Sequence, residues 1–323
     1  MTERLIDTID TAIINLDRRP DRMECIYRNI PIILSNCNNS SSDNGVHPLQ
    51  YRRFPAIDGT NLSNYYKSNL EFRELLDTIR GQQRVLGEVG CSLSHYSLWH
   101  SHAHSPKSKY LLVLEDDVMF TDQTMQNLES ITQDIQSLEH CIIQTNNNTQ
   151  RVVVGAASTS DAGLQWDVIY VGGQWTPDYA IDSNNSYFKY QGVTSESLGD
   201  YYSLSNEYSK RQSNTLYRRK NRRSAVIHND RNIWYSPLFR TAGAFLVSQK
   251  GARKLLAAVE TDTALFMKTP LDMWILEMDF RGYLDVFDGL PHPFYQAGFN
   301  LVKEPAHIEN DIHRTKYDTV RLD

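Results

Sequence analysis

The sequence predicts an α/β protein built around one mostly parallel sheet. Short apolar segments rich in β-branched residues alternate with segments of helical period along the 323 residues, and this order is typical of parallel strands joined by crossover helices. The strand within Lys109–Phe120 ("KYLLVLEDDVMF") opens with an uninterrupted apolar run, as expected for a sheet covered on both faces. No internal repeat is visible, and the length suits one large α/β domain or two small ones.

The first 120 residues supply strands and helices in turn. Thr11–Leu16 is short, apolar and β-branched, so it is predicted to be a buried strand. A helix is predicted next, with Asp17 as N-cap and Pro20 in its first turn. The later segments are a polar loop at Ser35–Gly45, a strand and turn within Gln50–Gly59, a solvent-facing helical region from Asn61 to Arg84, a helix over Gly87–His104 and the strand in Lys109–Phe120.

The second half contains one long stretch that does not fit the alternation. Residues 174–232 are rich in Ser, Asn, Tyr and charge, and a polar stretch of this length is usually a lid, a binding insertion or disorder. The elements around it are a helix at Thr124–Leu138, strands at Trp166–Gly173 and Leu238–Ser248, helices at Gln249–Glu260 and Pro270–Phe280, and a last strand and turn at Tyr283–Gln296.

Charge and composition exclude several classes of protein. The net charge of −6 leaves no basic footprint, so nucleic acid is not expected as a partner. No window of 18 apolar residues and no signal peptide are seen, which predicts no transmembrane segment and a cytoplasmic location. The four cysteines are widely spaced without a CxxC pair, so reduced thiols are expected.

Three consecutive acids, Glu115, Asp116 and Asp117, follow the apolar run of one strand. In open α/β sheets ligands bind beyond the carboxyl ends of the strands, and alternation places Glu115 and Asp117 on one side and Asp116 on the other. Carboxylates beside a buried strand need a cation. Mg²⁺ or Mn²⁺ shared with a substrate diphosphate would serve; the alternative is a solvated acidic turn.

Seven motifs together resemble glycosyltransferase family 25, which includes lipooligosaccharide galactosyltransferases and collagen β-galactosyltransferases. They occur in the family's order between about Ile13 and Gln296, interrupted by the two polar stretches. The motifs are "INLDRRPDR", "FPAIDG", "GEVGCSLSH", "LLVLEDDV", "WDVIYVGG", "TAGAFLVSQKGARKLL" and "TPLDMW".

The resemblance implies one GT-A domain over residues 1–323. Residues 1–125 would mainly form a Rossmann-like, nucleotide-sugar-binding half, and residues 126–323 an acceptor half around the same mostly parallel sheet. The implied reaction is inverting transfer of a hexose from UDP-galactose or UDP-glucose, dependent on Mn²⁺ with Mg²⁺ as the alternative. The implied acceptor is a hydroxyl of a glycan or of hydroxylysine.

The resemblance also implies roles for the acids. Asp117 would bind the metal, Glu115 would face the ribose of the nucleotide, and Asp116 would belong to the same donor site. A further ligand from late in the chain is expected, with His313 chosen and His307 and Asp311 as alternatives.

The end of the first strand and the helix after Gly87 supply the other donor contacts. Asn15 and Leu16 lie where a nucleotide base would stack, and Arg18 and Arg22, four residues apart, could reach one anion together; the alternative is a helix start with solvated arginines. Ser94 and His95 resemble the family's Ser-His pair, against the alternative that the small residues of this segment permit tight helix packing.

Inverting transfer needs a base, and Asp272 in "TPLDMW" is the candidate by resemblance. The alternative for Asp272 is a helix N-cap, and Glu277 and Asp279 are the reserve bases. Trp166 is either a pocket wall or part of the core.

Three rival interpretations remain. Cys91 and His95, at i and i+4, make a zinc site conceivable. The whole protein is alternatively an inactive binding module of the same fold. The third interpretation is a metal-dependent phosphoester hydrolase, which would require a denser set of His and Asp ligands than this sequence offers.

Overall fold

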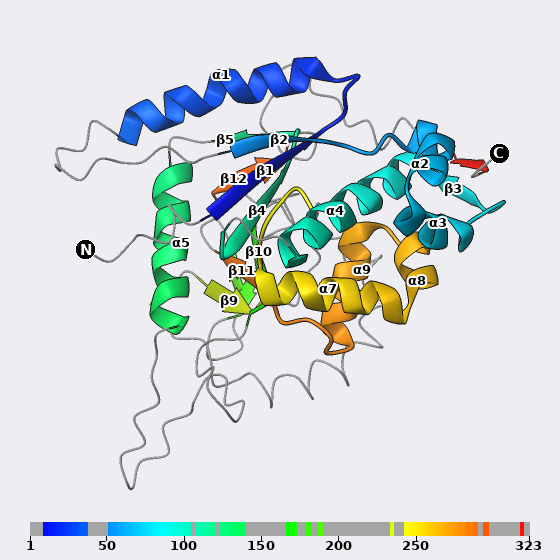
Figure 1. Cartoon of the computed structure of the whole chain (residues 1–323). Helices are drawn as coiled ribbons and strands as arrows, with labels where there is room; N and C mark the ends of the chain where they lie inside the picture. Colours follow the sequence, from blue (N-terminus) through cyan, green and yellow to red (C-terminus); the bar gives the residue numbers. More distant parts are fainter. Residues whose placement is uncertain are drawn as a thin grey trace, which may run out of the picture.

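The computed structural model describes residues 9–37, 51–104, 108–120, 123–139, 166–172, 179–181, 187–189, 233–235, 242–289, 293–296 and 317–319. Within this part of the chain a central sheet of seven strands lies between two layers of helices (Figure 1). The polar stretches at 38–50 and most of 174–232 lie outside the described residues, so their predicted roles stay predictions. Among the described helices none is both long enough and apolar enough to cross a membrane.

The central sheet has the strand order β2-β1-β4-β10-β6-β11-β9. Its members are β1 (Ile9–Asn15), β2 (Tyr51–Pro55), β4 (Tyr110–Glu115), β6 (Val168–Gly172), β9 (Ile233–Tyr235), β10 (Ala244–Ser248) and β11 (Val286–Gly289). Two-stranded pairs are β5 (Val118–Phe120) with β12 (Phe294–Gln296), β3 (Gln83–Val85) with β13 (Tyr317–Thr319), and β7 (Tyr179–Ile181) with β8 (Tyr187–Lys189). The helices are α1 (Pro20–Cys37), η2 (Gly59–Asn61), α2 (Leu62–Ser68), α3 (Leu70–Asp77), α4 (Leu86–His104), α5 (Thr124–Glu139), α7 (Gln249–Thr261), α8 (Thr263–Lys268) and α9 (Leu271–Phe280).

The prediction of a mostly parallel sheet is confirmed. Strands β1, β2 and β4 run in one direction, and β6 and β11 run in the same direction across the sheet. Only β10, between β4 and β6, and the edge strand β9 run the opposite way. The carboxyl ends of β1, β4 and β6 therefore meet at one edge of the sheet, where ligands bind in folds of this kind.

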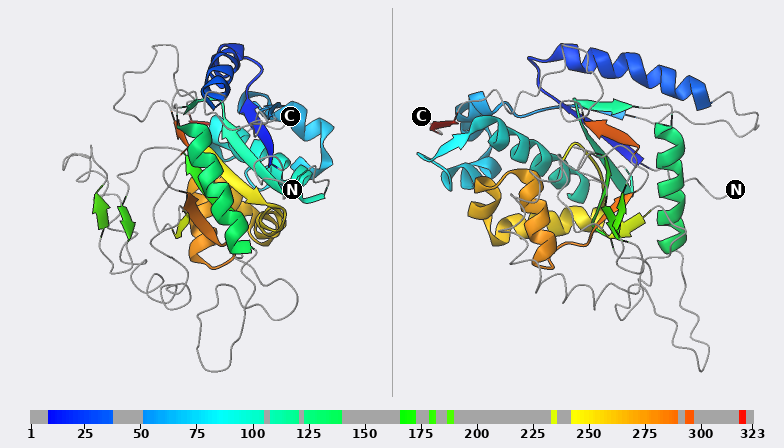
Figure 2. Two further views of the ribbon diagram at one scale, coloured as in Figure 1. Left: turned by 90° about the vertical axis from the view of Figure 1, so that its left-hand side faces the viewer. Right: turned by 180° about the vertical axis from the view of Figure 1, so that it is seen from behind.

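Helices cover both faces of the sheet, as the apolar run of β4 predicts. Leu112 and Leu114 belong to a core shared with residues of α1 and α5. Leu111 and Val113 belong to a second core shared with α4, α7, α8 and α9 on the other face. Figure 2 shows the two helical layers from further sides. The side chains of one strand thus alternate between two hydrophobic layers.

Helix α4 packs unusually close to the loop after β2. Helix α4 begins at Leu86, one residue before the predicted start at Gly87, so Gly87 and Gly90 lie inside the helix. A Cβ on Gly90 would come within 2.3 Å of the carbonyl oxygen of Ile57 and 2.8 Å of the amide nitrogen of Gly59. Only a glycine permits this approach, which confirms the packing interpretation for this part of the motif.

One predicted helix cap is wrong. Helix α1 begins at Pro20, as the sequence indicates, but Asp17 lies three residues before it. Asp17 forms an ion pair with Arg53 instead, so its carboxylate links the turn after β1 to β2.

Candidate active site

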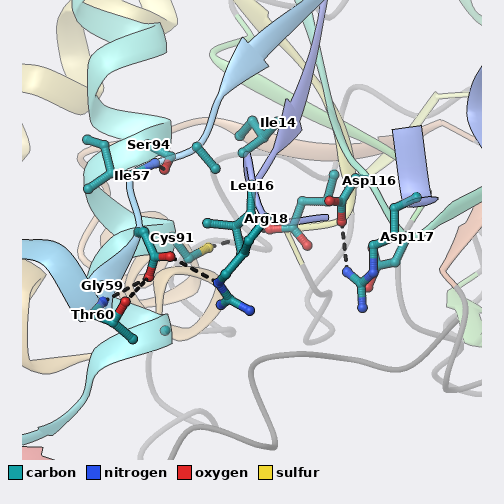
Figure 3. A pocket seen from close by; sticks show the side chains of 15 residues that line it. Ile14, Leu16, Arg18, Ile57, Gly59, Thr60, Cys91, Ser94, Asp116 and Asp117 are labelled. Carbon is teal, nitrogen blue, oxygen red and sulfur yellow. Dashed lines mark hydrogen bonds and ion pairs between the residues drawn. The ribbon is translucent and has the colours of Figure 1, made fainter. Parts of the chain in front are cut away.

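The acid triplet lies at the carboxyl end of β4, where a cleft of about 680 Å³, counting its open mouth, enters the protein (Figure 3). Strand β1 lies beside β4 with Ile14 paired to Glu115, so the turn after β1 opens onto the same edge. The cleft walls are this turn, the loop at residues 56–60, the first half of α4, and the three acids. The candidate donor-binding residues therefore lie close together at the carboxyl ends of the strands.

Asp116 is neutralised by the protein's own cation. Arg22 of α1 donates from Nη1 to Asp116 Oδ1 at 2.8 Å, and Asn15 donates from Nδ2 to Asp116 Oδ2 at 2.7 Å. Arg53 fixes the orientation of Asn15 by donating to its Oδ1 at 2.8 Å. Burial raises the pKa of Asp116, and the Arg22 guanidinium opposes that rise. One oxygen of Asp116 thus serves an internal ion pair, and the other accepts an internal hydrogen bond.

Glu115 points to the opposite face of the sheet from Asp116, as alternation predicts. His95 Nε2 lies 3.2 Å from Glu115 Oε1, and the Cys91 thiol donates to the same oxygen at 3.5 Å. Burial disfavours the Glu115 carboxylate, but the contacts with His95 and Cys91 and the charge of Arg22 together outweigh it, so the pKa of Glu115 is lowered. His95 is fully buried and stacks on Phe245 at 5.4 Å between ring centroids. His95 therefore acts on the cleft through Glu115.

Asp117 lies in the turn between β4 and β5 and lines the cleft. Its side chain is almost completely buried, with 5% of its surface exposed. Together with Glu115 it offers carboxylate oxygens, the donors that Mg²⁺ and Mn²⁺ prefer. The residues present therefore fit a hard divalent ion. His313, His307 and Asp311 lie outside the described residues, so the further ligand stays a prediction.

Arg18 and Arg22 contact two different carboxylates. Arg18 donates from Nε to Asp58 Oδ2 at 2.9 Å, across the mouth of the cleft. Asp58 Oδ1 accepts from Thr60 N at 2.9 Å and from Thr60 Oγ1 at 2.7 Å. In this structure the two arginines do not share one anion. Leu16, predicted beside the nucleotide base, lines the cleft between them.

Ser94 of α4 is hydrogen-bonded to the loop at residues 56–60, which forms one wall of the cleft. Its hydroxyl accepts from Ile57 N at 2.8 Å and donates to Gly90 O at 2.7 Å. Because the side chain is fully buried, Ser94 holds the 56–60 loop against α4 at the position where Gly90 allows close contact.

Asp272 is the second residue of α9 and is not its N-cap. The N-cap position is Pro270, and Asp272 Oδ1 accepts from Met273 N at 2.7 Å. Burial raises the pKa of Asp272 to about 7, and the nearby charges of Glu115 and Glu88 add to the rise. A carboxylate that titrates near neutral pH suits a general base.

The two reserve bases have other contacts. Glu277 accepts from Arg281 Nε at 2.7 Å. Asp279 is buried and accepts from Val286 N at 3.4 Å, where α9 meets the start of β11. Neither these two residues nor Asp272 is among those that line the cleft, but Asp272 lies near enough to Glu115 for its pKa to be raised by that charge.

Trp166 belongs to the core, at the opposite edge of the sheet from the acids. It precedes β6 and stacks on Tyr110, the first residue of β4, at 5.3 Å between ring centroids. Its neighbour Asp167 is paired with Lys254 at 2.6 Å. The core interpretation of Trp166 is therefore supported, and the pocket-wall interpretation is not.

The residues around the cleft match a known family. Residues 9–156 fit the sequence model described as glycosyltransferase family 25 (LPS biosynthesis protein). Residues 9–156 of this chain are therefore similar to glycosyltransferase family 25. This similarity supports glycosyl transfer as the class of reaction.

Relatives from several sources carry the same segment. A procollagen lysyl hydroxylase and glycosyltransferase of Acanthamoeba polyphaga mimivirus is 33% identical over 131 residues, which cover 39% of this chain and 14% of the relative. A glycosyltransferase 25 family member of Aedes aegypti is 27% identical over 178 residues, covering 52% of this chain and 26% of the relative. An inactive glycosyltransferase 25 family member 3 of Homo sapiens is 28% identical over 167 residues, covering 50% and 21%. The matched part thus spans about a quarter or less of each of these relatives.

The family segment and the cleft coincide. Every residue that lines the cleft lies between Ile14 and Asp117, within the matched residues 9–156. Asp272 lies beyond that segment, and the fold alone brings it to the acids. The similarity to the family therefore covers every residue that lines the cleft and does not extend to Asp272.

The sequence did not single out Asp58, Arg53 and Glu88. Asp58 lies in the motif "FPAIDG" and Glu88 in "GEVGCSLSH". Both motifs were recognised in the sequence, but neither residue was given a role. Arg53 follows an ordinary strand pattern, and only the pairing of β1 with β2 brings it to Asn15.

Proposed function

We propose that the protein is a metal-dependent, inverting glycosyltransferase of the GT-A fold. It transfers galactose or glucose from the UDP-sugar to a hydroxyl of a glycan or hydroxylysine-type acceptor. The observation that carries this proposal is the convergence of the acid triplet, Arg18 and Arg22 on one cleft at the carboxyl edge of the sheet. Similarity to the family supports the reaction class, and residues 1–125 and 126–323 are proposed as the donor and acceptor halves.

In this proposal Asp117 binds Mn²⁺, or Mg²⁺, with His313 as a further ligand. Asp117 suits this role better than Asp116, because Arg22 and Asn15 already occupy both oxygens of Asp116. The ion, when bound, offsets the negative charge of the diphosphate leaving group.

The donor contacts come from the end of β1. Asn15 and Leu16 border the nucleotide, and Arg18, which is partly exposed at the mouth of the cleft, is available to a phosphate if Asp58 releases it. Arg22 acts by holding Asp116 in place, and Ser94 and His95 act by fixing the loop and Glu115.

The chemical step assigned to Asp272 is proton removal. Its carboxylate takes the proton of the acceptor hydroxyl, while the acceptor oxygen forms a bond to the anomeric carbon. The bond between that carbon and the diphosphate oxygen breaks, and UDP leaves with the electron pair. A pKa of about 7 lets Asp272 accept a proton at neutral pH and release it afterwards.

A screen of UDP-sugars with Mn²⁺ tests this function. Release of UDP is measured for UDP-galactose and UDP-glucose, with Mn²⁺ and with EDTA, for the natural protein, Asp117→Ala and the control Asp134→Ala on α5. We expect turnover that needs Mn²⁺, is lost in Asp117→Ala and persists in Asp134→Ala. Undiminished turnover in EDTA would count against the metal.

The second candidate is a binding module without activity, as the human relative named above is described. It predicts that UDP-sugar binds with Mn²⁺ and that no UDP is released with any acceptor. The presence of Asp117 and of a base with a pKa near 7 favours the enzyme instead.

A further inference from the structure

One wall of the cleft brings together a sulfur, an imidazole nitrogen and a carboxylate oxygen. Cys91 and His95 occupy positions i and i+4 of α4, and Glu115 ends β4 opposite them. Ligand atoms of the three residues all lie within 4.8 Å of one another. The separations of the Glu115 oxygen are 3.5 Å from the Cys91 sulfur and 3.2 Å from His95 Nε2.

These separations are close to what one tetrahedral zinc ion requires. Zinc binds sulfur at roughly 2.3 Å and nitrogen or oxygen at roughly 2.0–2.2 Å, so its ligand atoms stand about 3.3–3.7 Å apart. Two of the three pairs are already at or near that spacing. The backbone positions therefore need little change to bind the ion.

We propose that Cys91, His95 and Glu115 form a zinc-binding site in the wall of the cleft. Thiolate and imidazole ligands select zinc over Mg²⁺ and Mn²⁺, which prefer oxygen. Asp117 offers oxygen only, whereas Cys91 and His95 add sulfur and nitrogen to the carboxylate of Glu115, which either ion could use. The zinc site does not depend on the proposed function.

The geometry indicates a reversible site with one open position. Three protein ligands leave the fourth position of zinc open, and Cys91 and Glu115 both line the cleft. His95 Nδ1 is buried and meets no hydrogen-bond partner among the described residues, although a zinc-bound histidine usually donates from its other nitrogen. The affinity should therefore be lower than that of structural sites with four protein ligands.

Zinc would bind Cys91 as a thiolate, so the thiol proton would leave on binding. Burial raises the pKa of Cys91 well above its usual value, and the nearby Glu115 carboxylate adds to the rise. Zinc binding would replace this proton, which passes to the solvent. Zinc at Glu115 would also compete with a donor nucleotide, a consequence that rests on the proposed function.

Cobalt titration of the full chain tests the site. Co²⁺ replaces zinc, and a cysteine ligand gives it a thiolate charge-transfer absorption in the near ultraviolet. We expect this absorption with about one equivalent of Co²⁺, and its loss when Zn²⁺ is added. Other histidines, such as the neighbouring pair His100 and His104 with ring centroids 4.2 Å apart, cannot produce a thiolate band.

The variants identify the ligands. Cys91→Ser should abolish the thiolate band and weaken Zn²⁺ binding by roughly 100-fold or more, because even the loss of a residue that only supports a ligand costs about 10–100-fold. Cys25→Ser removes the other described free thiol and should change neither measurement. His95→Gln, with folding checked by circular dichroism, should weaken binding while the thiol remains.

Three outcomes would overturn the zinc site: absence of the band, a band retained in Cys91→Ser, or equal loss in Cys25→Ser. Binding of UDP with Mn²⁺ in zinc-free buffer is measured separately, so failure of one proposal is distinguishable from failure of the other.

Discussion

Asp272 is the single residue on which the proposed chemistry depends most. Asp272→Asn keeps the oxygen that accepts from Met273 N but cannot take a proton. We expect the turnover number to fall by about 10²–10⁴-fold, the usual contribution of a general base, while UDP binding is unchanged. Glu277→Gln, which alters a carboxylate paired with Arg281, should retain activity in the same assay.

The pH dependence of the reaction should report the surroundings of Asp272. Because the proposed base must be ionised, kcat/KM should rise with pH through about 7. Glu88→Gln removes a negative charge that raises the pKa of Asp272, so the rising limb should move to lower pH. Glu24→Gln on α1 makes the same charge change and should leave the limb in place. If the rising limb of kcat/KM stays at the same pH in Glu88→Gln, a group other than Asp272 produces it.

The two arginines after β1 should differ sharply in their contribution to stability. Arg22 pairs with Asp116 where both side chains are at most 10% exposed, whereas Arg18 is 46% exposed beside Asp58. Arg22→Met leaves a buried carboxylate without its cation and should lower the free energy of unfolding by about 3 kcal/mol. Arg18→Met should cost less than about 1 kcal/mol.

Urea denaturation at pH 7 measures both arginine variants. Equal losses of the free energy of unfolding in the two variants would show that the buried pair of Arg22 and Asp116 contributes no more than the exposed pair of Arg18 and Asp58.

The sequence predicted the position of the acids better than their partners. A strand period of two placed Glu115 and Asp116 on opposite faces, and the structure agrees. The prediction that Arg18 and Arg22 lie four residues apart on one helix is wrong, because Arg18 precedes α1 and the two arginines reach different carboxylates. That outcome depends on where α1 lies over the sheet, which is a matter of tertiary packing.

At the scale of elements, α4 and the 56–60 loop form one rigid unit. Gly90→Ala would force a Cβ against Ile57 O and Gly59 N, and such overpacking should destabilise the protein by about 1–3 kcal/mol. Ser101→Ala, on the exposed side of the same helix, should be neutral or slightly stabilising because alanine favours helix. The midpoint of chemical denaturation measures both. A neutral Gly90→Ala would mean that the loop can move away from α4.

Strands and helices were predictable because each has its own hydrophobic period, but strand direction was not. The segment that became β10 has the same apolar pattern whether it runs parallel or antiparallel to β4. For the same reason the sequence could not tell which edge of the sheet Trp166 occupies, and its stacking on Tyr110 places it opposite the acids.

At the scale of the whole molecule, the proposed metal and nucleotide should stabilise the fold together. A ligand that binds only the folded chain at 100 times its dissociation constant adds about 2.7 kcal/mol to the free energy of unfolding. We expect UDP with Mn²⁺ to raise the melting temperature by a few degrees, and each alone to raise it less, because the ion offsets the repulsion between the diphosphate and the acid triplet.

The matched variants show whether that stabilisation passes through the acid triplet. Asp117→Asn keeps the size of the side chain but removes the charge that would bind the ion, so the joint effect of UDP and Mn²⁺ should fall to the sum of the separate effects. Asp134→Asn, away from the cleft, should keep the full shift. If Asp117→Asn also keeps it, the nucleotide and the ion bind elsewhere, and the acids at the end of β4 serve only the ion pair and hydrogen bonds that hold α1 and α4 to the sheet.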